Sequence, residues 1–412
     1  MTHAPVSEKE RITEIDIVRG FALFGVLLVN VACFNGTFLS MMTGNAPLTN
    51  PLQLHGIDRT ITLAIKLFAE GKFYTIFSFL FGLGFYIFIS RAVEKGLPSK
   101  PLFRRRMFAL LIFGLLNLIL VWWGDILHVY SLGGFIFLAF DNKPVKALVR
   151  WSIILLIFSA AVSMLFSSSP ATIQSRLSAN PSSNNLVSPE WVSQSIEVFQ
   201  NGGFAEIVRF RVFSEIPFLV AYLLFMLPKT MAMFILGMIA GKLKVFNNIS
   251  GNLLFINRTW ALTGVLGCLT LAGALLSGYP VMSGSLNNPV LYSLLYELST
   301  VSVSLFYITS LLKLLTIPRV AVTLRPLQAV GRMALTNYLV QCIVCSLVFY
   351  GHGLGYLGRM SMGSGVIFTI SFYATQVVIS NLWFKHYKFG PFERIWRDYT
   401  YKKHVASLQH SA

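Results

Sequence analysis

A carboxylate and an imidazole lie three positions apart in the segment from Trp122 to His128. If Asp125 opens a helix, its side chain and that of His128 can face each other. The carboxylate would then either cap the helix or orient and charge-stabilise the imidazole as a general base. Catalysis by Asp125 and His128 is therefore one hypothesis, and simple capping is the alternative. Asn117, two turns before Asp125, is expected to point into the bundle as a cavity-lining residue.

A second charged motif precedes the first apolar segment. Asp16 and Arg19 are three residues apart and so share one helix face. They form either an interfacial ion pair that sets the topology or a cytoplasmic site for an anionic ligand. In that site Arg19 would hold a phosphate and Gly20 would admit close approach. The motif predicts Asp16, Arg19 and Gly20 as donor-binding residues.

Other polar side chains fall within apolar segments, where an ionisable group costs at least about 2.5 kcal/mol to insert and so marks a functional candidate. Glu297 is expected to hold a proton or a cation if a buried basic partner exists, or only to hydrogen-bond within its own helix. Asn337 and Gln341 share a helix face and would bind neighbouring helices. The further predicted cavity-lining residues are Glu297, Arg332, Asn337, Gln341 and His352, the last in a glycine-rich turn.

The sequence contains no recognised metal or cofactor motif. It has no Walker A loop, dinucleotide fingerprint, HExxH or GxSxG element. All four cysteines lie in apolar segments, and the pair Cys342 and Cys345 lacks a second pair of ligands. We therefore expect no metal and no permanently bound cofactor.

Composition indicates that a membrane, not water, is the main solvent of this chain. Of its 412 residues, 55% are hydrophobic and 12% are charged, whereas a soluble domain carries about 25% charged residues. The net charge of +17 does not indicate nucleic-acid binding, because the basic residues are divided among short segments instead of forming one patch. The lipid bilayer is the expected partner, and the sequence does not fix the oligomeric state.

Ten apolar segments are long enough to be predicted as transmembrane helices. Short cytoplasmic loops are rich in Lys and Arg, and placing both termini in the cytoplasm puts 25 of the 33 basic residues on that side. The prediction is an all-α integral membrane protein, a polytopic bundle of about ten transmembrane helices with both termini cytoplasmic. The segments are 17–34, 72–90, 107–123, 126–140, 150–167, 217–241, 259–278, 290–312, 327–350 and 363–384.

Residues 1–412 are expected to form a single transmembrane domain with a long extracytoplasmic loop at 168–215. Residues 168–200 are rich in Ser, Asn and Pro, which predicts a flexible surface loop. From Phe204 to Glu215, apolar and charged residues alternate at helical spacing, which predicts an interfacial amphipathic helix. In the segment 217–241, Pro228-Lys229 interrupts the apolar run and can divide the helix into a re-entrant piece and a short span.

Both ends of the chain resemble the YeiB-like family of bacterial multi-pass membrane proteins. The N-terminal part of the resemblance lies in RITEIDIVRGFALFGVLLVN, KFYTIFSFLFGLG and GDILHVY, which begin at Arg11, Lys72 and Gly124. The C-terminal part lies in GRMALTNYLVQ and GPFERIWR, which begin at Gly331 and Gly390. The resemblance implies a multi-pass protein of the bacterial cytoplasmic (inner) membrane.

The opening motif, with its Asp-x-x-Arg-Gly core, is also similar to the start of heparan-glucosaminide acetyltransferase and other transmembrane acyltransferases. This resemblance implies an acyl donor such as acyl-CoA bound in the membrane domain, and a histidine that transfers the acyl group to an extracytoplasmic acceptor. YeiB-like proteins tend to carry a histidine on the third helix where this chain has Asn117. Here His128 or His55 would have to supply the imidazole.

The leading hypothesis is an enzyme that moves an acyl group from a cytoplasmic thioester to a small-molecule, glycan or lipid acceptor at the outer face. The alternative is a transporter or exporter of a small molecule or lipid-linked substrate, without covalent chemistry. Proton-coupled carriers usually need acidic residues near the midplane. Only Glu297 clearly meets that need in the sequence, and this favours the enzyme.

Overall fold

The fold is described from a computed structural model of the chain. It describes residues 11–43, 54–167, 188–277 and 288–409. Within these ranges the regular structure is entirely helical, with no strand. The fold class predicted from the apolar segments is confirmed to that extent.

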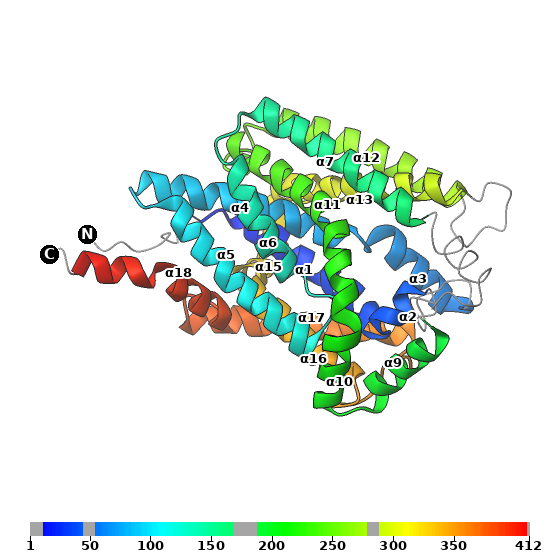
Figure 1. Cartoon of the computed structure of the whole chain (residues 1–412). Coiled ribbons are helices and arrows are strands. Elements are labelled where there is room, and N and C mark those ends of the chain that lie inside the picture. Colours follow the sequence, from blue (N-terminus) through cyan, green and yellow to red (C-terminus); the bar gives the residue numbers. More distant parts are fainter. Residues whose placement is uncertain (1–10, 44–53, 168–187, 278–287, 410–412) are drawn as a thin grey trace.

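The described helices pack into a single bundle (Figure 1). Two of them, η2 and η4, have the wider π-helical hydrogen-bond pattern. The helices are α1 Thr13–Phe34, α2 Phe38–Met42, α3 Gly56–Phe68, α4 Lys72–Glu94, α5 Ser99–Leu116, η2 Asn117–Val121, α6 Leu127–Phe137, η3 Leu138–Phe140, α7 Val145–Ser167, α9 Pro189–Asn201, α10 Phe204–Phe210, η4 Arg211–Glu215, α11 Ile216–Lys242, α12 Leu253–Leu276, α13 Pro289–Leu315, α14 Pro318–Leu324, α15 Pro326–Arg332, α16 Ala334–Phe349, α17 Met362–His386 and α18 Pro391–Gln409.

Seven helices of the described chain are long and apolar enough to cross a membrane, and a bent pair raises the number to eight. Such spans need about 20 predominantly apolar residues. The seven are Thr13–Phe34, Gly56–Glu94, Val145–Met164, Tyr222–Lys242, Leu253–Leu276, Val290–Leu315 and Met362–His386. These properties are those of a multi-pass membrane protein.

The predicted segment 327–350 is not one straight helix. α15 and α16 meet at Met333 with an angle of 83° between them, so the prediction of one continuous helix was wrong there, whereas the bent pair together still passes as a candidate span. By contrast, α11 runs from Ile216 to Lys242 with Pro228 inside it. The predicted segment 217–241 is therefore one helix, not two pieces.

Two further predicted segments form helices that do not pass as spans by length and composition. In 107–123, α5 continues into η2, but the first half of α5 carries Lys100 and three arginines. In 126–140, α6 has 11 residues before η3 follows. The total of ten spans and the orientation of the termini therefore stay predictions.

The region between α7 and α11 contains more helix than its composition predicted. Residues 168–187 lie outside the described residues, but Pro189–Asn201 forms α9 where a flexible loop was expected. The Ser188 side chain begins this helix by accepting a hydrogen bond from the Trp191 amide. The predicted helix Phe204–Glu215 is present as α10 and η4 and leads directly into α11.

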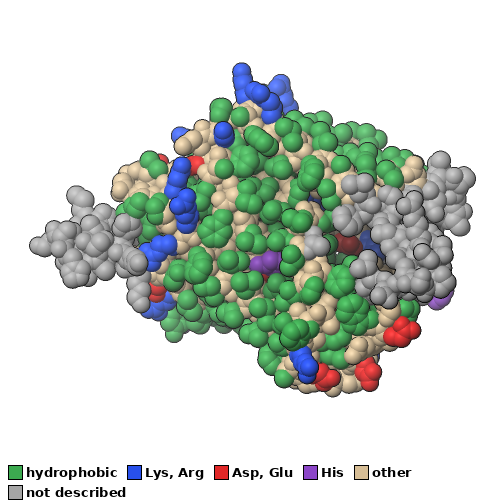
Figure 2. Space-filling model, viewed as in Figure 1, with side chains coloured by type: hydrophobic (Ala, Val, Ile, Leu, Met, Phe, Trp, Pro, Cys, Tyr) green, Lys and Arg blue, Asp and Glu red, His purple; other side chains and the backbone are tan. Residues whose placement is uncertain are grey.

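Basic side chains gather towards one end of the bundle, and hydrophobic side chains cover much of the face between the ends (Figure 2). α18 lies at the basic end, and α1 begins on the same side (Figure 1). The Arg105 guanidinium donates to the Tyr399 carbonyl at 2.7 Å, and the Trp396 indole donates to the Arg106 carbonyl at 2.7 Å. These bonds fix α18 against α5 at that end.

Glycines allow two of the central helices, α4 and α11, to cross with their backbones in contact. A Cβ atom at Gly82 would meet the Phe234 carbonyl, and one at Gly237 would meet the Phe79 carbonyl. Small residues at helix crossings permit this approach in membrane bundles. Gly84, only two residues away, has open space in the direction of a Cβ atom.

The crossing predicts opposite effects for two neighbouring substitutions on α4. Gly82→Ala should destabilise the protein by about 1–3 kcal/mol, because the added methyl group overpacks a backbone contact. Gly84→Ala should be neutral or slightly stabilising, because alanine favours helix over glycine. Thermal unfolding of the detergent-solubilised chain measures both, and equal Tm values for the two variants would contradict the packing described.

Candidate functional site

Asp125 and His128 contact each other directly in the interior of the bundle. The His128 ring atom Nδ1 lies 2.8 Å from Asp125 Oδ2, and the His128 backbone N–H donates to the same oxygen at 2.9 Å. The carboxylate therefore caps the start of α6 and orients the imidazole at once, so the two alternatives for Asp125 are both present. An ionised carboxylate can only accept hydrogen bonds, which places the proton of a neutral ring on Nδ1 and leaves Nε2 free of a proton.

The other carboxylate oxygen of Asp125 is held by neighbouring helices. Asn117 Nδ2 donates to Asp125 Oδ1 at 2.8 Å, and the Tyr338 hydroxyl donates to it at 3.4 Å. The Asp125 side chain is fully buried, whereas 12% of the His128 side chain is exposed. The arrangement keeps the carboxylate dry and fixed while one edge of the imidazole stays accessible.

Asp125 and His128 lie deep in the bundle, although Asp125 falls between the two predicted segments 107–123 and 126–140. Asn117 also contacts Cys342 Sγ at 3.6 Å, and Cys342 lies about 10 Å from either end of α16 at the rise of an α-helix. The turn before Asp125 reaches further out, because Trp122 stacks on Phe34 at the end of α1 with ring centroids 4.4 Å apart. Asp125 and His128 therefore lie about half-way along α16.

The short helix α6 reaches this depth because α5 lets it approach closely. A Cβ atom at Gly114 would collide with the backbone of His128. Asn117 then begins the π-helical turn η2, whose last hydrogen bond joins the Trp122 amide to the Asn117 carbonyl at 2.8 Å. Such turns are frequent at functional sites. Here the turn brings the Asn117 amide to the carboxylate of Asp125.

The motif at the start of α1 forms an ion-paired cluster. Asp16 accepts from Arg11 Nε at 2.7 Å and from Arg19 Nη1 at 3.0 Å. Arg19 Nη1 also donates to the Gly331 carbonyl at 3.3 Å, which joins α1 to the end of α15. The ion pair expected from the sequence is present, with Arg11 as an additional partner.

The structure gives Gly20 a packing role. A Cβ atom at Gly20 would meet the Leu327 backbone, and one at Gly331 would meet the Asp16 carbonyl. Gly20 therefore permits α15 of the same chain to pack closely against α1. The binding of a donor by Asp16, Arg19 and Gly20 stays a prediction.

Asn337 and Gln341 join α16 to its neighbours. Asn337 Nδ2 donates to the Val330 carbonyl at 3.2 Å and to Ser380 Oγ at 3.1 Å. Gln341 Nε2 donates to Gln376 Oε1 at 2.8 Å, which links α16 to α17. These contacts fit the helix-binding role that amides play in membrane bundles. Near the kink, the Arg332 guanidinium lies over the Phe384 ring, 4.0 Å from its centroid.

Glu297 has the buried basic partner that its functional interpretation required. Lys229 Nζ lies 2.7 Å from Glu297 Oε2, and the Ser163 hydroxyl donates to Glu297 Oε1 at 3.2 Å. These residues belong to α11, α13 and α7. Sequence reasoning treated Lys229 only as an interruption of a helix, although a lysine in an apolar segment was itself a signal.

His352 lies apart from these clusters, in the turn that follows α16. Its ring packs edge-on against Phe204 and Tyr350, with centroids 5.6 and 6.1 Å away. Burial, and then the nearby charge of Arg211, lower the pKa of His352 from its ordinary value. This shift favours the neutral imidazole. The ring lies apart from Asp125 and His128.

Glu393 is a buried acidic residue that is not among the predicted site residues. Its carboxylate accepts from the Leu335 and Thr336 amides at 2.7 and 3.0 Å and from the Thr336 hydroxyl at 2.6 Å. These amides begin α16 just after the kink, where no residue of the same helix can accept from them. Burial raises the pKa of Glu393. The available signal was an acidic residue in the mainly basic segment after α17, although Asp398 shares that signal.

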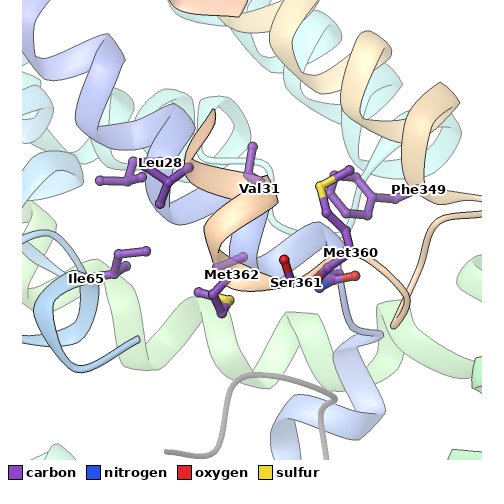
Figure 3. Close-up of a pocket in the computed structure, with 11 residues that line it drawn as sticks. Leu28, Val31, Ile65, Phe349, Met360, Ser361 and Met362 are labelled. Carbon is purple, nitrogen blue, oxygen red and sulfur yellow. Dashed lines mark hydrogen bonds between the residues drawn. The ribbon is translucent and has the colours of Figure 1, made fainter. Parts of the chain in front are cut away.

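A small, mainly apolar pocket lies between the end of α1, α3, the end of α16 and the start of α17 (Figure 3). Its walls include Leu28, Val31, Ile65 and Met362, with Ser361 as a polar group. None of its lining residues belongs to the Asp125 or Asp16 clusters. Among the described residues, no group of three His, Cys, Asp or Glu side chains is placed to hold a metal ion.

The fold and these buried polar clusters define a polytopic helical protein with the properties of a multi-pass membrane protein. Residues 240–403 match a family described as "Protein of unknown function (DUF418)". The chain is 31% identical over 414 residues to the uncharacterized protein YxaH of Bacillus subtilis (strain 168), and the match covers 96% of each chain.

Two further relatives match over nearly the whole chain. An uncharacterized 39.9 kDa protein in the amylase 3′ region of Bacillus acidopullulyticus is 30% identical over 412 residues, which cover 97% of this chain and 96% of the relative. The uncharacterized protein YeiB of Escherichia coli (strain K12) is 26% identical over 408 residues, which cover 95% and 96%. The chain belongs to the DUF418 family, and the YeiB-like assignment is confirmed.

The hydrogen bonds of Glu393 predict a stability difference between two acidic positions of α18. Glu393→Ala should destabilise the protein by about 1–3 kcal/mol, because it leaves buried amides at the start of α16 without an acceptor. Asp398→Ala is the matched control, since its side chain is 67% exposed. Thermal unfolding in detergent compares them, and a Glu393→Ala variant as stable as Asp398→Ala would refute this role.

Proposed function

We propose that this protein is a membrane-embedded acyltransferase in which His128 is the general base. The observation that supports this most is the 2.8 Å contact between His128 Nδ1 and the buried carboxylate of Asp125. A carboxylate in this position fixes the ring orientation and stabilises the imidazolium that forms when Nε2 takes a proton. Asn117 supports the arrangement by holding the carboxylate from the far side.

The proposed step transfers an acyl group from a thioester to a hydroxyl or amine. His128 Nε2 removes the proton of the acceptor as its oxygen or nitrogen attacks the thioester carbonyl carbon. A new ester or amide bond forms while the carbon–sulfur bond breaks. The imidazolium then returns the proton to the thiolate that leaves, so His128 ends the cycle neutral and no oxidant or metal is needed.

The depth of His128 suits a reaction between partners on opposite sides of a bilayer. Asp125 and Cys342 are linked through Asn117 about half-way along α16, so neither partner has to cross the whole bundle. We place the protein in the bacterial cytoplasmic membrane with both termini inside. The donor is then acyl-CoA, which enters near Asp16 and Arg19, and the small-molecule, glycan or lipid acceptor enters from the outer face.

Transport without covalent chemistry is the second candidate function. The ion pair of Lys229 and Glu297 favours it, because buried ionisable pairs between membrane helices mark ion or substrate pathways. Transport requires no role for Nε2 of His128. The two functions therefore differ in what happens when that imidazole is removed.

Removing the imidazole should abolish acyl transfer without preventing donor binding. For His128→Ala, we expect the rate of CoA release from acetyl-CoA, with glucosamine as the acceptor probe, to fall about 10²- to 10⁴-fold, the usual contribution of a general base. The assay uses the full chain in nanodiscs, and acetyl-CoA binding is measured in parallel. His386→Ala, in the last turn of α17, is the control and should keep full activity.

A fully active His128→Ala variant would remove His128 from the mechanism. Absence of acetyl transfer by the unmodified chain, with both acceptor and thioester present, would contradict the enzyme proposal and leave transport as the better account.

Substitutions that remove charges from the Asp16 cluster test whether the donor binds near the start of α1. Arg19→Ala should weaken acetyl-CoA binding, because a guanidinium that can hold phosphate is lost. Asp16→Asn should alter binding as well, since it releases both guanidinium groups from their shared partner. Arg394→Ala provides a control at the same end of the bundle, with a side chain 74% exposed. Binding that is indifferent to Arg19→Ala and Asp16→Asn would overturn the assignment.

A further inference from the structure

Arg211 places a charged side chain in the interior of the protein and has no part in the acyl-transfer step. It is the first residue of the π-helical turn η4, and its side chain is completely buried. The guanidinium lies 5.5 Å from the centre of the Phe199 ring and 5.8 Å from that of Tyr350. Glu215, at the end of the same turn, is equally buried, and its Oε2 lies 3.9 Å from Arg211 Nε. That distance allows attraction between the charges but is too long for a hydrogen bond.

The Arg211 side chain makes a hydrogen bond to a different helical turn. Its Nη1 donates to the Ile119 carbonyl at 3.0 Å. Ile119 belongs to η2, which ends at Val121, and carbonyls in the last turn of a helix have no amide of their own helix to accept from. Arg211 therefore satisfies an orphan carbonyl. It also places a positive charge at the C-terminal end of a helix, where the helix dipole favours it.

The turn that Arg211 contacts also carries Asn117. Asn117 Nδ2 donates to Asp125 Oδ1 at 2.8 Å, and Asp125 Oδ2 lies 2.8 Å from His128 Nδ1. Asn117 and Ile119 are two residues apart in one five-residue turn. A displacement of the Ile119 carbonyl therefore moves the residue that holds the carboxylate.

Stability alone does not require a charged pair at this place. Replacing a buried ion pair by apolar residues of similar volume is often neutral or stabilising, and ionisable residues inside membrane proteins usually serve a function. π-helical turns are frequent at functional sites, and Arg211 joins two of them, η4 and η2. The property that Arg211 controls is therefore expected to be the position of η2.

We propose that Arg211 is a positioning residue through which the segment from α9 to η4 fixes the orientation of the Asp125–His128 pair. The importance of this orientation for catalysis rests on the proposed role of His128 as general base. Arg211 holds the Ile119 carbonyl, the turn holds Asn117, and Asn117 holds the carboxylate that orients the imidazole. A movement of η4 that breaks the Arg211 bond releases the ring, so the segment expected on the acceptor side regulates the base.

The protonation of the His128 ring tests this proposal without any assay of activity. Solid-state NMR of the full chain in lipid vesicles, with isotope-labelled histidine and at mildly alkaline pH, distinguishes rings protonated at Nδ1 from rings protonated at Nε2. The His128 signal is the one absent from His128→Ala. Arg211→Met should lower the ratio of Nδ1- to Nε2-protonated rings about tenfold or more, the weight of one hydrogen bond to a charged group. Arg209→Met is the matched control, because Arg209 is exposed two residues earlier, and it should leave the ratio unchanged.

Two further variants separate positioning from structural support. Arg211→Met combined with Glu215→Gln removes both charges, so no unpaired charge stays buried, and it should lower the ratio as Arg211→Met does. Arg211→Lys keeps a charged donor for the Ile119 carbonyl and should recover most of the ratio. A purely structural role predicts a lower Tm with the ratio unchanged. An unchanged ratio in the double variant, or no recovery in Arg211→Lys, would overturn the proposal.

The kinetics of acyl transfer supply a readout that fails separately. The double variant should lower kcat about 10²-fold, the cost of a misplaced catalytic group. The KM for acetyl-CoA should not change, because the proposed donor site lies near Asp16 and Arg19. A shifted His128 ratio in a chain that transfers no acyl group contradicts the enzyme proposal and supports positioning by Arg211. An unchanged ratio contradicts positioning even if acyl transfer occurs.

Discussion

The carboxylate of Asp125 is the interaction on which the centre of the bundle depends. It accepts from Asn117, Tyr338 and both the backbone and the ring of His128. A buried carboxylate without such donors would be strongly destabilising in a low-dielectric interior. The same bonds hold the π-helical turn after α5, the start of α6 and one face of α16 together. The orientation of the His128 ring thus follows from the hydrogen bonds that stabilise the buried carboxylate of Asp125.

The kink between α15 and α16 follows the same physical rule. Breaking a helix inside a membrane protein exposes backbone amides that water cannot reach. Glu393 of α18 supplies the acceptor for the amides at the start of α16, and Arg19 supplies a donor to Gly331 at the end of α15. The ion-paired motif of α1 and the kink are therefore one unit, in which side chains from distant parts of the sequence replace lost backbone partners.

The sequence predicted what depends on local pattern and missed what depends on distant partners. Apolar length located the helices, and the three-residue spacing paired Asp125 with His128, although Asp125 lies two residues before α6 begins at Leu127. The bend at Met333 was missed, since its amides are satisfied by Glu393, 58 residues from Leu335. Helix α9 was missed because Ser and Asn favour turns, although Ser188 is used as its cap. Lys229 was recognised as a break and not as the partner of Glu297, because that contact joins α11 to α13.

The central claim is that the imidazole of His128 acts as a general base, taking the acceptor's proton beside the thioester carbonyl at the middle of the bundle. The most direct measurement is a cryo-electron microscopy structure of the full chain in a nanodisc with a non-hydrolysable thioether analogue of acetyl-CoA. We predict that the nucleotide lies near Arg19 and that the acyl carbonyl lies beside His128 Nε2, with the Nδ1 contact to Asp125 intact. An analogue bound with its acyl end away from His128, or a His128 ring turned away from Asp125, would contradict it.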